Sequence, residues 1–222
     1  MSVLSLPTPE PPAASAPFAK GSRKLAAPAR PAGRAALAHH LGIFPLPART
    51  LALVTGNAPG DLPADAALAR WVAARLGALS GRLLAAESSA AAFRRDAASL
   101  LSLGPEPAPS GEDALVGLAA ASRRLASAGL LAEPAAAAFA DVLAALPGPE
   151  TPAAPRKALE DAARGGFPAA LATLVELLGD PDVEDGAVRD AVGRLAAGGT
   201  RPGADALAGV VALVRDVALG RS

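Results

Sequence analysis

The sequence predicts an all-α protein, and three features of its composition carry that prediction. The 222 residues include 60 Ala and 33 Leu, two residue types with high helix propensity. Val, Ile and Thr, which strands favour, number only 20 together, and Tyr is absent. The 22 Gly and 22 Pro separate short apolar segments, as expected of residues that end and begin helices. We therefore expect an irregular array of nine or ten short helices in one or two small bundles, preceded by a disordered Pro/Ala-rich N-terminal tail.

Residues 1–32 are predicted to be that tail, because they contain few large apolar side chains to offset the entropy of ordering. A basic run without an intervening acid lies in and just after this segment and consists of Lys20, Arg23, Lys24, Arg30 and Arg34. The simplest interpretation is a solvated, flexible tail. The run is also compatible with contact to an anionic surface, or with an export or targeting signal.

A first helical domain is predicted for residues 33–103, with its helices separated by glycine and proline. Gly42 and Gly56 follow the first two helices, and Pro47 and Pro63 lie where the next helices begin. The four expected helices span residues 34–41, 47–55, 63–80 and 82–103.

Apolar residues recur at alternating steps of four and three along the last two of these helices. The positions are Val72, Leu76, Leu79, Leu83, Ala86, Ala90, Phe93, Ala97 and Leu100. Such heptad spacing is typical of a coiled-coil seam, although three of the positions are Ala and glycines interrupt the stretch. The alternative is two consecutive helices that line one small core. The candidate partner-binding face, which could also mediate a dimer, consists of Leu68, Trp71, Val72, Leu76, Leu79, Leu83 and Phe93.

Two Pro-rich linkers are predicted to divide the rest of the chain, at residues 104–111 and 147–154. Between them we expect a helical hairpin at 112–146. A C-terminal helical bundle is expected at 155–222, with helices at 155–164, 168–178, 182–197 and 203–219.

The side chains that usually perform catalysis are scarce. Cys is absent, which excludes disulfides, thiolate catalysis and zinc ribbons. None of the three lysines lies in a phosphate-binding loop. The acidic segment at 180–186 lacks the glycine and the bidentate glutamate of a calcium-binding loop. With 21 basic and 21 acidic residues, the chain also lacks the overall charge of a nucleic-acid-binding protein. We expect no cofactor, no metal and no nucleic-acid partner.

Two alternatives to a purely structural protein stay open. The only histidines, His39 and His40, are adjacent, and successive side chains of a helix point about 100° apart, so the pair is poorly placed to chelate one ion. A small enzyme, or a metal-dependent hydrolase, built around His39 and His40 is nevertheless the first alternative. The second is peripheral attachment to a membrane through the basic run and the helix at 207–219, which is too short to span a bilayer.

Residues 37–79 resemble an N-terminal helical region of flagellar hook-length control proteins. The resemblance is carried by Leu41-Gly42-Ile43-Phe44-Pro45-Leu46-Pro47 and the following Leu51-Ala52-Leu53-Val54, and by Leu62-Pro63 at the next helix start. It implies a Pro- and Ala-rich protein that is exported through the flagellar secretion apparatus. The mixed α/β C-terminal domain of that family has no counterpart in the helical pattern after residue 150.

The sequence thus predicts a non-enzymatic helical interaction or scaffold protein of the flagellar export system, located in the cytoplasm and open to export. Its partner would be another protein or a second copy of the chain, and no segment is expected to span a membrane.

Overall fold

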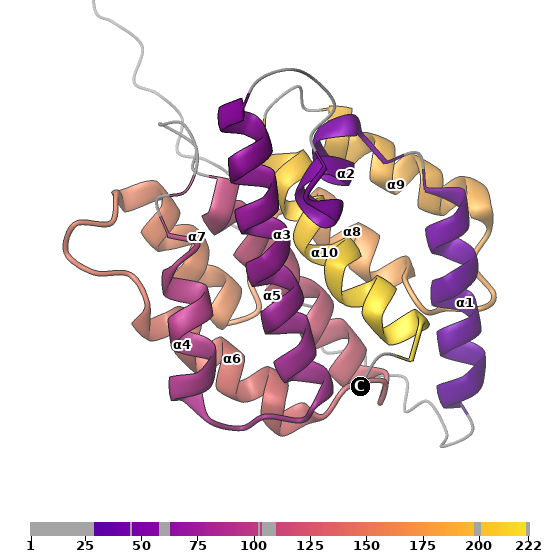
Figure 1. Ribbon diagram of the computed structural model, residues 1–222. Coiled ribbons are helices and arrows are strands. Elements are labelled where there is room, and N and C mark those ends of the chain that lie inside the picture. The colour runs from indigo at the N-terminus through magenta and orange to yellow at the C-terminus, as the bar shows by residue number, and fades with distance from the viewer. Residues whose placement is uncertain are drawn as a thin grey trace, which may run out of the picture.

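The chain folds into a bundle of helices in a computed structural model that describes residues 29–44, 46–57, 63–101, 103, 110–197 and 201–220 (Figure 1). These residues contain ten helices and no strand, which confirms the predicted all-α class. The helices are α1 (Ala29–Ile43), α2 (Ala48–Thr55), α3 (Pro63–Leu84), α4 (Ala90–Ala98), α5 (Ser110–Ser127), α6 (Glu133–Ala145), α7 (Ala153–Ala163), α8 (Ala169–Leu177), α9 (Asp185–Ala197) and α10 (Arg201–Ala218).

The N-terminal boundary of the fold differs from the prediction. Helix α1 begins at Ala29, so the last part of the segment expected to be a tail is helical, and Arg30 and Arg34 lie on this helix. Pro31 is compatible with this position because the first turn of a helix does not need its backbone N–H. The disorder predicted for residues 1–28 concerns a segment outside the described residues, and so do Lys20, Arg23 and Lys24.

The heptad-like stretch is divided at a different place than expected. Gly81 does not end a helix, because α3 continues through it to Leu84. The break comes at Ala86, whose φ of 55° lies in the left-handed region. The chain then straightens before α4, where the Glu87 carboxylate accepts a hydrogen bond from the backbone N–H of Ser89 at 2.8 Å.

Helices α5 and α10 cross at the centre of the bundle (Figure 1). Glycine on each helix faces the backbone of the other: a Cβ on Gly117 would lie 1.8 Å from the carbonyl oxygen of Ala206, and one on Gly209 would lie 2.0 Å from that of Ala114. No larger residue fits at either position without moving a helix. This close approach buries α10 almost completely from Ala204 to Val214.

One hydrophobic cluster contains buried side chains from all ten helices of the described chain. Helix α10 packs against α1, α2, α3, α8 and α9, whereas α5 packs against α6, α7 and α8. The two central helices therefore join the N-terminal helices to the C-terminal ones. No helix within the described residues is long and apolar enough to cross a membrane.

Candidate functional site

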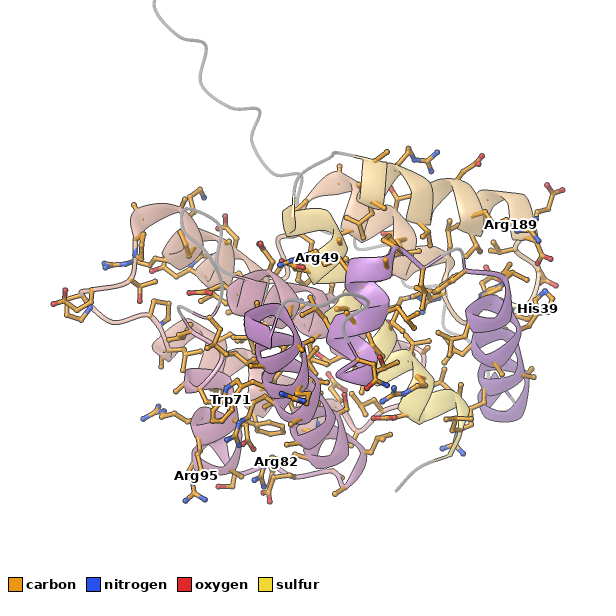
Figure 2. All side chains as sticks on the ribbon, turned by 45° about the horizontal axis from the view of Figure 1, so that its top comes forward. His39, Arg49, Trp71, Arg82, Arg95 and Arg189 are labelled. Carbon is orange, nitrogen blue, oxygen red and sulfur yellow. The ribbon has the colours of Figure 1, made fainter. Side chains whose placement is uncertain are left out.

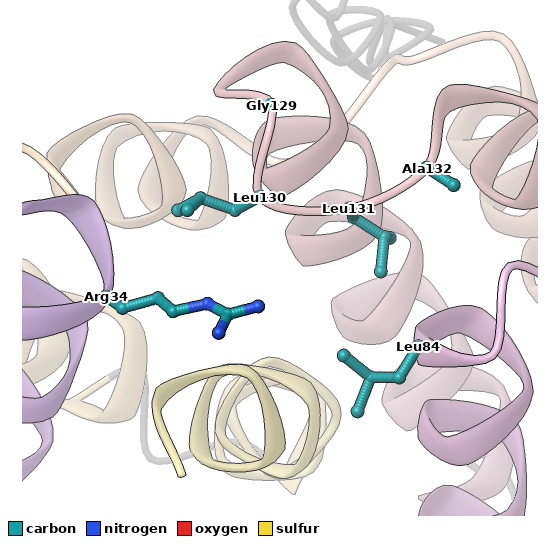
Figure 3. A pocket seen from close by; sticks show the side chains of 6 residues that line it. All are labelled: Arg34, Leu84, Gly129, Leu130, Leu131 and Ala132. Atoms are coloured by element: carbon teal, nitrogen blue, oxygen red, sulfur yellow. The ribbon is translucent and has the colours of Figure 1, made fainter. Parts of the chain in front are cut away.

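A pocket of about 220 Å³ lies where α1, the end of α3 and the connection between α5 and α6 meet (Figure 3). Arg34 and Leu84 come from the two helices, and the bend at residues 129–132 forms the remaining wall. The guanidinium group of Arg34 points into this space between leucine side chains (Figure 3). We refer to it below as the Arg34 pocket.

The bend that forms this wall follows from the sequence at the end of α5. Gly129 has a φ of 70°, a left-handed conformation that favours glycine at a helix C-terminus. The backbone N–H groups of Leu130 and Leu131 both donate to the carbonyl oxygen of Leu125, at 2.8 and 3.2 Å. Helix α6 then begins after Ala132, which has no side-chain cap. The positive end of the α6 dipole consequently lies beside the pocket.

Arg34 makes no hydrogen bond or ion pair with any of the described residues. None of the residues that line the pocket is acidic, and the nearest acid in the sequence, Glu133, is not part of the lining. The pocket therefore presents an uncompensated positive charge to whatever enters it. Of the basic run predicted from the sequence, Arg34 is the member whose side chain the structure describes.

A second pocket, of about 450 Å³, lies between α1 and the segment that leads into α9. Its rim holds an ion pair in which the Nε2 of His39 donates to the carboxylate of Asp185 at 2.8 Å. This hydrogen bond lowers the pKa of Asp185. Burial, and then the neighbouring His39, lower the pKa of His40, which is only 2% exposed.

The His39–Asp185 pair could not be predicted from the sequence, because the two residues are 146 positions apart. Around this second pocket Asp180, Asp182 and Glu184 accompany Asp185 along one short segment. Such a concentration of carboxylates disfavours an anionic ligand there. Within the described part of the chain, no three His, Asp or Glu residues are close enough together to hold a metal ion.

A buried ionic cluster lies where the N-terminal ends of α2, α5 and α10 meet. The carboxylate of Asp205, which is fully buried, accepts hydrogen bonds from Arg49 Nε at 2.6 Å and Nη2 at 2.9 Å. The hydroxyl of Thr50 donates to the carbonyl oxygen of Ala204 at 2.9 Å. Burial, with Asp205 and Glu112 nearby, raises the pKa of Asp113 to about 7. Neither of the two pockets described above is lined by these residues, and we assign the cluster a role in joining the helices.

The face predicted to bind a partner is mostly inside the protein. Val72, Leu76, Leu79, Leu83 and Phe93 have no exposed surface, and the ring of Phe93 lies 5.6 Å from that of Phe139. Leu68 is partly buried. These side chains line the protein's own core, and a partner cannot contact five of the seven while that core is intact.

Trp71 is the exception on that face, because 46% of its surface is exposed. Its indole N–H donates to the carbonyl oxygen of Ser99 at 3.3 Å, and the guanidinium of Arg75 lies 4.6 Å from the ring centroid. Trp71, Arg82 and Arg95 lie on one side of the molecule, on α3 and α4, whereas His39 and Arg189 lie on the other (Figure 2).

The chain thus forms a helical bundle with a cationic pocket and a second pocket that carries a histidine–aspartate pair. A family model described as oxamate carbamoyltransferase subunit AllH matches residues 100–214, which is 115 of the 222 residues and more than half of the chain. The protein belongs to this family. No curated protein and no solved structure matches the chain.

This match overturns the flagellar interpretation. The predicted resemblance to hook-length control proteins, and with it the flagellar scaffold or export function, is wrong: the matching family is that of an enzyme subunit. The motifs behind this resemblance consist mostly of Leu, Ala, Gly and Pro at helix boundaries, which any short-helix protein of this composition contains. An enzyme-related role, the alternative drawn from the histidines, agrees better with the family description.

Proposed function

We propose that this protein is one subunit of a multi-subunit enzyme that transfers a carbamoyl group to oxamate. The observation that carries the proposal is the family match, which extends from the residues just before α5 almost to the end of α10. It therefore includes both central helices and all the helices between them in the sequence. The matched segment is the structural centre of the bundle rather than a peripheral part.

In this proposal the chain is one part of the enzyme, and other subunits supply the remaining parts. The family is described as a subunit, so a protein partner is part of the description. The exposed Trp71 with Arg75 beside it has the composition of an interface anchor, because Trp and Arg dominate the binding energy of many protein interfaces. Contact with another subunit, rather than with a second copy of the chain, is the arrangement we favour. The cytoplasmic location stays a prediction.

The proposed reaction requires a positive charge to bind the substrate and a base to accept a proton, and each of the two pockets offers one of these. Oxamate is an anion, so its site needs positive charge, and the Arg34 pocket supplies it. In carbamoyl transfer from carbamoyl phosphate, the amide nitrogen of oxamate attacks the carbamoyl carbon, phosphate leaves, and the nitrogen loses a proton. A histidine oriented by a carboxylate, as His39 is by Asp185, is a common general base in such reactions.

The proposal is tested by isolating the complex. The tagged full-length chain is co-expressed with the proteins encoded beside it, and the components that co-purify are identified by mass spectrometry. The complex is then assayed for carbamoyl transfer from carbamoyl phosphate, with oxamate present or omitted. We expect a defined set of partners and oxamate-dependent product. A chain that purifies alone under these conditions, or a complex without oxamate-dependent transfer, contradicts the proposal.

A further inference from the structure

We propose that the Arg34 pocket binds a small monocarboxylate through its carboxylate group and, resting on the proposed function, that this ligand is oxamate. The family description names no residue or pocket for the substrate. The assignment to this pocket comes from its charge, its size and the shape of its walls.

The charge is the first argument. Arg34 reaches into the pocket with no carboxylate among its described neighbours, and the lining contributes no acid. A guanidinium group donates two parallel hydrogen bonds to a carboxylate, a geometry that favours it over other cationic groups at such sites. The start of α6 at Ala132 lies on the same side, but Glu133 in its first turn offsets the positive end of the helix dipole, so the charge for an anion comes from Arg34. The second pocket differs in having a carboxylate, that of Asp185, in its lining.

The size of the pocket is the second argument. A volume of about 220 Å³ accommodates a ligand of a few heavy atoms and is smaller than the pockets that hold drug-sized molecules. Leu84, Leu130 and Leu131 line the space into which the guanidinium group of the exposed Arg34 points (Figure 3).

The wall opposite Arg34 is fixed in place, which limits the entropy lost on binding. The bend at residues 129–132 is held by two backbone hydrogen bonds to Leu125 and by the left-handed Gly129. Leu130 and Leu131 are each only 8% exposed and belong to the core cluster. Arg34 is the long, exposed side chain of the pocket, so a ligand would order one side chain rather than a loop.

Arg34 also lies near the end of α10, where a Cβ on Gly220 would be 4.0 Å from its Nη1. If Arg34 only stabilised that helix end, its substitution would lower the melting temperature and leave oxamate binding unchanged. The two roles therefore predict different results for ligand binding and for thermal unfolding.

The test measures binding of oxamate to the purified full-length chain by titration calorimetry. We expect saturable binding that weakens at least tenfold in Arg34→Gln, with partial recovery in Arg34→Lys. The matched control is Arg94→Gln, which removes an exposed arginine of α4 outside the pocket and leaves the affinity unchanged. Leu84→Trp, which fills the pocket from the end of α3, weakens binding without removing charge. The melting temperature of each variant establishes that it is folded.

Three results overturn the proposal: no saturable binding of oxamate to the full chain, the same affinity in Arg34→Gln as in the wild type, or the same loss in Arg94→Gln. Pyruvate, in which a methyl group replaces the amino group of oxamate, tests the ligand's identity. Equal affinities for the two compounds overturn the oxamate assignment and support a general monocarboxylate site. These binding results are independent of the activity of the complex, so failure of the pocket and failure of the proposed function are distinguishable.

Discussion

Arg49 and Asp205, which are 156 residues apart in the sequence, form a two-point ion pair that connects α2 to α10. The carboxylate of Asp205 is fully buried, whereas the Arg49 side chain keeps 32% of its surface exposed. Arg49 therefore supplies the charge that allows a carboxylate to lie inside the bundle. The same junction contains Thr50, whose hydroxyl donates to the backbone of α10.

Loss of the Arg49 guanidinium is expected to destabilise the fold strongly. Arg49→Gln leaves the buried Asp205 carboxylate without its partner, a change that costs about 3–5 kcal/mol in comparable buried pairs. Urea denaturation measures the free energy of unfolding. The double variant Arg49→Gln/Asp205→Asn should lose much less than the sum of the two single variants, and additive losses would show that the two residues do not depend on each other.

The crossing of α5 and α10 should not tolerate a side chain at Gly117. In Gly117→Ala the new methyl group would lie 1.8 Å from the Ala206 carbonyl oxygen, so the helices must move apart, and we expect a loss of about 3 kcal/mol or more. Gly77→Ala in α3 is the matched control, because nothing lies within 4 Å of the added Cβ. That control should gain about 0.5–1 kcal/mol from reduced flexibility of the unfolded chain. Equal effects of the two substitutions on urea denaturation would rule out the close crossing.

Asp113 should make the protein less stable as the pH rises toward neutrality. Its pKa is about 7 in the folded chain and 3.8 in the unfolded chain, so the folded state binds more protons between these values. The resulting stabilisation is complete below about pH 4 and decreases by up to about 1.4 kcal/mol per unit as the pH rises to about 7. The facing groups are Asp205, Glu112 and Arg49.

Substitution isolates this contribution. The difference in unfolding free energy between wild type and Asp113→Asn should shift in favour of the variant between pH 4 and 7 and then stay constant. A difference that does not change with pH would mean that Asp113 is ionised throughout this range in the folded protein.

His40 should act in the opposite direction, making the protein less stable as the pH falls. Its pKa is lowered in the folded state by burial and by His39, so the unfolded chain takes up the proton first. The loss of stability begins as the pH falls below about 6.5, the value for an unperturbed histidine. His40→Asn should remove this slope in thermal unfolding experiments, whereas His39→Asn, at an exposed position, should retain it. Parallel pH profiles for wild type and His40→Asn would refute the assignment.

Much of the fold could be predicted because helix signals are local. Glycine and proline mark most of the observed helix ends, and the heptad positions of α3 are those buried in the core. The break at Ala86 could not be predicted, since alanine favours helix and adopts the left-handed conformation here only in its tertiary setting. The burial of the apolar face on α3 could not be predicted either, because an apolar stripe that lines a core and one that binds a partner have the same sequence pattern.

The candidate sites depend on contacts between distant segments, which a single sequence does not specify. Arg34 was identified only as one of five basic residues, and its pocket exists because the bend after α5 lies opposite α1. No sequence pattern links the histidines to an acid, whereas the fold places Asp185 of α9 beside His39. The flagellar resemblance failed for a related reason: it relied on residue types that this composition repeats throughout.

The measurement that tests the central claim most directly is an omission and add-back assay of the reconstituted enzyme. Oxamate-dependent carbamoyl transfer is measured with all subunits, without this chain, and after its return in increasing amounts. We predict that activity is lost on omission and recovers in proportion to the added chain until the complex is saturated. Full activity in the absence of the chain would contradict its role as a subunit of the transferase.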